Sequence, residues 1–115
     1  MVKRIDRVNE LIQQELNKIL EEHFRNEGVL VTVSYVKTAP DLRAAKAFIS
    51  ILPFNKAPEM LEKLKEEFPK FQLILSQTIE LKYIPKIELE LDESLEYEDK
   101  IQHLIDKTKD DKMSS

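Results

Sequence analysis

The chain has 115 residues, of which 42% are hydrophobic and 35% charged, and this composition favours one soluble globular domain. Its apolar runs are too short to cross a membrane, and the absence of cysteine excludes a disulfide framework and a thiolate zinc site. The net charge of −4 divides into +2 over residues 1–86 and −6 over residues 87–115, so the first part of the chain is compatible with an RNA partner.

The first segment, Ile5 to Phe24, is predicted to be a helix. The chain turns amphipathic from its first residues, which argues against a secretory signal and for a cytoplasmic protein. Gly28, the only glycine, follows where the helix is expected to stop. Apolar side chains recur at spacings of three and four residues and form one stripe, made of Ile5, Val8, Ile12, Leu16, Ile19 and Leu20.

Two strands are predicted next, over residues 29–36 and 45–52. The connector between them contains Pro40 and Asp41, which are typical of turns, so the strands should pair antiparallel. Pro53 is expected to end the second strand. Period-two alternation places Val29, Val31, Val33 and Tyr35 on one face of the first strand, and Ala45, Ala47, Ile49 and Ile51 on one face of the second.

Two consecutive helices, separated at Pro69, are predicted between the second and third strands. Pro58 suits the first position of the first helix. Because proline is disfavoured in a helix interior, Pro69 is placed in the first turn of the second helix, which Pro85 should stop. A third strand follows at residues 87–91. Residues 95–107 are predicted to form a short helix, and residues 108–115 a disordered tail.

These elements predict an α+β fold in which helices cover one face of a three-stranded sheet. We expect one domain over residues 1–107. Two consecutive helices between the second and third strands give an element order that resembles the type II KH fold, an RNA-binding architecture.

Three segments narrow this resemblance: RVNELIQQELNKIL (residues 7–20), VTVSYVKTAPDLRAAKAFIS (residues 31–50) and LKYIPKIELELDES (residues 81–94). They are similar, in this order, to the three signature regions of the ribosome-binding factor A family. The resemblance implies a non-enzymatic ribosome assembly factor that binds the immature small ribosomal subunit and its rRNA. It also implies a role in late small-subunit maturation and rRNA processing, and a link to growth in the cold. We expect a monomer, with ribosomal proteins as further partners.

The family resembles KH domains in outline but carries an Ala-x-Gly kink between the two helices, where other KH domains have a Gly-x-x-Gly loop. Counting back from Leu81 places that kink on Glu67-Phe68-Pro69 in this sequence. Proline removes a backbone donor and keeps the backbone further from a phosphate than glycine would. The kink is therefore interpreted mainly as architecture.

Eight basic residues are predicted to contact RNA, because Arg and Lys donate charge-assisted hydrogen bonds to phosphate: Arg4, Arg7, Lys18, Arg25, Arg43, Lys46, Lys70 and Lys82. The first four fall on one arc of the first helix, where the alternative is a solvated face with intrahelical ion pairs such as Glu21–Arg25. Arg43 and Lys46 belong to the turn and second strand, where Asp41 is expected to cap the turn.

The last two candidates flank the second predicted helix. Lys70 would stand beside free N–H groups at the start of that helix, and Lys82 would stand near its end, where a cation suits the helix dipole. Tyr83 and Phe71 could stack on a base, but a core position is the preferred interpretation for both.

Nothing in the sequence indicates catalysis. His23 and His103 lie in different predicted helices, without a cysteine or a ligand cluster, so we expect no enzyme, metal site or cofactor. A single glycine excludes the usual phosphate-binding loops. The alternative function is a KH-like protein-interaction module that does not bind RNA, and it is favoured by the net acidity, by the missing glycines at the kink and by the lack of arginines in the second predicted helix.

Overall fold

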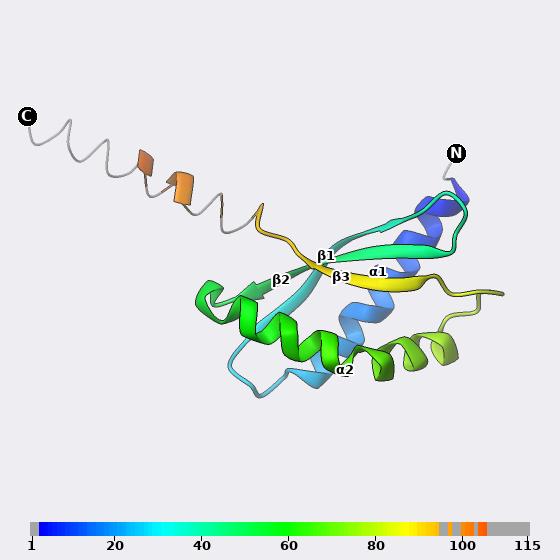
Figure 1. The fold of residues 1–115 in the computed structure, drawn as a ribbon, viewed down its shortest axis with the longest axis horizontal. Coiled ribbons are helices and arrows are strands. Elements are labelled where there is room, and N and C mark those ends of the chain that lie inside the picture. Colours follow the sequence, from blue (N-terminus) through cyan, green and yellow to red (C-terminus); the bar gives the residue numbers. More distant parts are fainter. Residues whose placement is uncertain (1–2, 95–96, 98–99, 103, 106–115) are drawn as a thin grey trace, which may run out of the picture.

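A computed structural model describes residues 3–94, 97, 100–102 and 104–105 (Figure 1). The elements are α1 (Arg4–His23), β1 (Leu30–Thr38), β2 (Ala44–Leu52), the short 3-10 helix η1 (Phe54–Lys56), α2 (Ala57–Thr78) and β3 (Lys86–Leu91). The predicted α+β fold with a three-stranded sheet is confirmed.

The sheet has the order β1-β2-β3, with β1 and β2 antiparallel and β2 and β3 parallel. A parallel pair needs a long crossover connection, and α2 provides it. One face of the sheet is buried, including Ala45, Ala47 and Ile49 of β2 with Ile87 and Leu89 of β3, as the alternation predicts. The apolar faces of α1 and α2 complete the same core, so both helices cover one face and leave the other open.

The apolar stripe predicted for the first helix is confirmed. Val8, Ile12, Leu16 and Leu20 are buried along α1, and Phe24 follows at 2% exposure. Burying a side chain of this size contributes roughly 1.5–3 kcal/mol, so the stripe fixes which face of α1 meets the sheet.

A β-bulge between Val33 and Tyr35 makes the prediction for Tyr35 wrong. Beyond the bulge Val36 is buried, whereas Tyr35 is 46% exposed on the opposite face. The side chain of Asn17 accepts a hydrogen bond from the Val33 N–H at 2.7 Å and donates one to the Val33 carbonyl at 3.2 Å. Backbone groups beside the bulge are thus paired by α1, which removes the usual penalty for leaving them unbonded.

One continuous helix, α2, replaces the two helices that were predicted around Pro69, which lies in the helix interior. Leu64 and Phe68 are buried before it, and Phe71 and Leu75 after it. Interior proline costs about 3 kcal/mol, whereas each of these buried side chains contributes roughly 1.5–3 kcal/mol. Packing on both sides of Pro69 therefore outweighs the local cost.

The C-terminal end of α2 also differs from prediction, because the helix ends at Thr78 and not at Pro85. Ile79 leaves the helix in an extended conformation and is buried. Gln72 then holds the returning chain, since its side chain donates to the Pro85 carbonyl at 3.1 Å and accepts from the Ile87 N–H at 3.2 Å. These contacts leave residues 80–85 as a loop that leads into β3.

The C-terminal region is described only in part. Residues 97, 100–102 and 104–105 are helical, in agreement with the short helix predicted over residues 95–107. The other residues of that helix between 95 and 107, and the predicted tail at 108–115, lie outside the described residues.

A chain of hydroxyl and carboxylate groups crosses the open face of the sheet at its β3 end. The Ser34 hydroxyl lies 2.7 Å from that of Ser50. Ser34 has the largest effect on Asp92 and lowers its pKa, partial burial opposes it with the next largest effect, and contacts from Ser94 lower the pKa further. The Asp92 carboxylate accepts a hydrogen bond from the Ser94 N–H at 3.0 Å, and the Asp92 N–H donates to the Ile49 carbonyl at 2.7 Å. The backbone of Asp92 thus ties the segment after β3 to β2.

We expect Asp92→Asn to lower the free energy of unfolding at pH 7 by at most about 1 kcal/mol, because solvent screens this carboxylate. A lowered pKa contributes stability above the ordinary carboxyl pKa of 3.8, and that stability is lost as the pH falls through the folded value. The stability difference between the two proteins in urea unfolding should therefore begin to shrink as the pH falls below about 4, and it should vanish only below the lowered pKa of folded Asp92. An offset of equal size at pH 7 and pH 3 would contradict this role for Asp92.

Candidate nucleic-acid interface

A surface hollow of about 710 Å³ lies where the first turn of α1, the β1–β2 turn and the loop after α2 meet. We call it the basic hollow, because three cations and one carboxylate line it. Its lining residues are Arg4, Val8, Asp41, Leu42, Arg43, Leu81, Lys82, Tyr83 and Ile84. Val8 is buried in the core, whereas Arg4, Arg43 and Lys82 are exposed to solvent.

The β1–β2 turn holds Arg43 at the hollow by a set of short contacts. The Asp41 carboxylate accepts a hydrogen bond from the Arg43 N–H at 3.0 Å, which confirms the predicted capping role. The Leu42 N–H donates to the Ala39 carbonyl at 2.8 Å, and Leu42 has a φ of 62°. A left-handed conformation is uncommon for leucine, so the surrounding turn must hold it.

The loop after α2 presents Lys82 and Tyr83 to the same hollow. Tyr83 is 77% exposed, so the preferred core position was wrong for this residue, whereas Phe71 is buried as predicted. The Lys82 ammonium lies 5.8 Å from the centre of the Tyr83 ring. Pro85 is fully buried next to this pair and anchors the loop that carries them.

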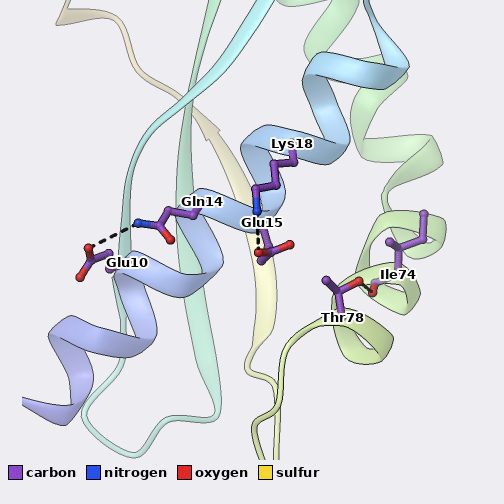
Figure 2. A network of polar contacts seen from close by, with 6 residues as sticks. All are labelled: Glu10, Gln14, Glu15, Lys18, Ile74 and Thr78. Atoms are coloured by element: carbon purple, nitrogen blue, oxygen red, sulfur yellow. Dashed lines mark hydrogen bonds and ion pairs between the residues drawn. The ribbon is translucent and has the colours of Figure 1, made fainter.

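The basic arc predicted on α1 is only partly free. Figure 2 shows that Lys18 contacts Glu15 at 3.2 Å and that Gln14 donates to Glu10 at 3.4 Å. These contacts match the alternative of a solvated helix face with intrahelical pairs. Arg7 is exposed on α1, whereas Arg25 is exposed in the turn after α1 ends at His23, so the predicted helical arc does not extend to Arg25. The structure brings only Arg4, from this group, to the basic hollow.

Lys46 lies apart from Arg43, although the sequence placed them in one group. It sits on the open face of the sheet, opposite Lys37 of β1, and contacts Glu90 of β3 at 3.2 Å. On the same face Tyr35 stacks on Phe48, with ring centres 4.3 Å apart.

The predictions that Lys70 lies at the start of a helix and Lys82 near the end of one are both wrong. Lys70 lies inside the continuous α2, so its neighbouring N–H groups are not the free groups of a helix start. Lys82 lies beyond the end of α2 at Thr78, too far for a helix-dipole contact. Figure 2 shows that last turn of α2, where the Thr78 hydroxyl donates to the Ile74 carbonyl at 2.8 Å. Lys70 is exposed, whereas Lys63, which lies earlier in α2, contacts Glu27 at 3.5 Å.

The sequence therefore predicted the three cations that line the hollow, but it did not predict that they lie close together in the fold. Arg4, Arg43 and Lys82 came from three separate groups, and no local spacing links residues 4, 43 and 82. The resemblance of residues 31–50 and 81–94 to signature regions was the one signal that marked both loops.

The described part of the chain shows neither a membrane-spanning helix nor a metal site. No helix there has the length and apolar character needed to cross a membrane. No cluster of three or more His, Asp or Glu side chains among those residues is arranged to hold a metal ion. His23 instead lies 2.8 Å from Glu67 and edge-on to Phe71, which links the end of α1 to α2.

The fold and the basic hollow define a small α+β domain with helices on one face of its sheet and a cationic surface between three connecting segments. Residues 4–105 match the family model for ribosome-binding factor A, and the chain belongs to this family.

Similar proteins include ribosome-binding factor A of Opitutus terrae, which is 37% identical over 92% of this chain and 88% of its own. The protein of that name from Nitrosococcus oceani is 40% identical over 90% of this chain and 84% of its own. The crystal structure of ribosome-binding factor A from Thermus thermophilus has a TM-score of 0.65 at 12% identity. It matches 77% of this chain and 97% of that one, and it supports the fold.

Proposed function

We propose that this protein is a ribosome assembly factor that binds the immature small ribosomal subunit through its rRNA. The observation that carries the proposal is the meeting of Arg4, Arg43 and Lys82 around one hollow. Charged donors on three segments that are held by packing can position phosphate oxygens with little loss of freedom on binding. Membership in a family named for ribosome binding supports the choice of partner.

In this proposal the protein acts without catalysis, as a cytoplasmic monomer, and assists late small-subunit maturation and rRNA processing, including growth in the cold. Arg7, Arg25 and Lys70 are exposed and would add phosphate contacts outside the hollow. Lys18 and Lys46 would first have to release Glu15 and Glu90, which costs at most about 1 kcal/mol for exposed pairs.

Sedimentation with small ribosomal subunits tests this function. We expect the protein to sediment with immature subunits at low salt and to be released as salt rises, because binding to phosphates frees counterions. Mature large subunits serve as the control and should retain little protein. Absence of any small-subunit association at low salt would refute the proposal. Association that does not respond to salt would favour the alternative of a protein-interaction module.

A further inference from the structure

Tyr83 is the least expected side chain at the basic hollow, because a tyrosine ring normally gains from burial. Its neighbours Ile84 and Pro85 are half-buried and buried, whereas Tyr83 is 77% exposed. The loop therefore turns this ring outward and keeps its apolar neighbours on the core. Burial of Pro85 and the Gln72 contact to its carbonyl hold the loop in this arrangement.

We propose that the basic hollow binds one unpaired nucleotide of RNA, with its base stacked on Tyr83 and its phosphates held by Arg4 and Arg43. This inference rests on the proposed function and specifies which RNA the site recognises. Proteins that hold single strands combine cations that follow the backbone with an aromatic ring that stacks on a base. All three groups line one hollow here.

Charge and size agree with this occupant. The hollow is lined by three cations, Arg4, Arg43 and Lys82, and by one carboxylate, that of Asp41. This carboxylate already accepts a hydrogen bond from the backbone N–H of Arg43. A volume of about 710 Å³ falls within the range of ligand pockets, roughly 300–1,000 Å³. Lys82 lies near the Tyr83 ring, so it can also reach the phosphate that follows the stacked base.

Duplex RNA should be a poorer ligand than a single strand. Its bases are stacked on their own neighbours, and specific recognition of RNA accordingly targets loops, bulges and ends with unstacked bases. The cations alone would still give duplex RNA a weak attraction that falls with salt.

The test uses a ten-nucleotide, uridine-rich RNA with a central 2-aminopurine, either single-stranded or annealed to its complement. We expect the protein to bind the single strand more tightly and to quench the fluorescence of its 2-aminopurine. Tyr83→Ala should weaken this binding about 10-fold to 100-fold and abolish the quenching. Tyr83→Phe keeps the ring and should bind as the parent does. Tyr97→Ala removes another exposed tyrosine, outside the hollow, and should change nothing.

Equal binding of the single strand and the duplex, or unchanged quenching in Tyr83→Ala, would overturn the inference. Competition with uridine monophosphate shows whether the site binds an RNA strand or a free nucleotide. A site for free nucleotides should be blocked by uridine monophosphate at concentrations near that of the RNA, whereas a site for a strand should not. Sedimentation of the same variants separates the two proposals. If the parent protein binds subunits but does not quench the 2-aminopurine fluorescence, only the stacking inference is refuted. If it never binds subunits, the proposed function is refuted.

Discussion

Replacing Arg4, Arg43 and Lys82 together by glutamine is expected to weaken binding to small ribosomal subunits about 100-fold at low salt. Each exposed cation is expected to contribute about 1 kcal/mol to phosphate binding, and 1.4 kcal/mol corresponds to a factor of ten. Glutamine keeps most of the side-chain length and removes only the charge. Quantitative sedimentation over a range of salt concentrations would measure the effect.

The salt dependence gives a second readout of the same variant. Each lost phosphate contact lowers the slope of log affinity against log salt by about 0.7–0.9, so the triple variant should lose about 2–3 from the slope. Lys56→Gln, Lys63→Gln and Lys65→Gln together remove the same charge from η1 and α2, away from the hollow, and provide the matched control. Equal losses in the two triple variants would show that net charge, and not the hollow, determines binding.

The main elements could be predicted from the sequence because their signals are local. The α1 stripe from Val8 to Leu20 and the alternation from Ala45 to Ile51 each repeat with the period of their own structure, and burial follows these periods. Pro53 and Pro58 marked the end of β2 and the start of α2 for reasons of backbone chemistry that do not depend on the rest of the fold.

Tyr35 shows why the strand faces were not fully predictable. The extra residue of the bulge shifts every later side chain of β1 to the other face. The bulge is stabilised by Asn17, which bonds the backbone of Val33 from a helix 16 residues earlier in the chain. A local pattern cannot reveal a partner that only the folded chain supplies.

The basic hollow could not be predicted either, because it too depends on contacts between segments that are distant in the sequence. Its walls are two connecting loops and a helix start, and their meeting depends on the parallel pairing of β2 with β3. Tyr83 adds a second reason, because its neighbours Leu81 and Ile84 are apolar and half-buried. Their pattern suggested burial for the whole segment, whereas the loop turns one ring outward.

Pro69→Ala is expected to raise the free energy of unfolding by about 1–3 kcal/mol. Proline in a helix interior lacks the N–H that would bond the Lys65 carbonyl, and its ring crowds that carbonyl, at a cost of about 3 kcal/mol. Alanine restores the donor and is the best helix former. Pro69 is exposed, so little apolar contact is lost. Thermal and urea unfolding would measure the gain, at about 4–8 °C per kcal/mol.

Lys70→Ala is the matched control, because Lys70 is also exposed in α2 and lysine and alanine differ little in helix propensity. It should change stability by less than about 0.5 kcal/mol. RNA binding at the hollow should be the same in Pro69→Ala as in the parent, since Pro69 does not line it. A loss of stability in Pro69→Ala would instead mean that proline shapes α2 so that Phe68 and Phe71 both reach the core. Pro69 would then serve packing in this chain, and the cations and Tyr83 at the basic hollow would hold the RNA.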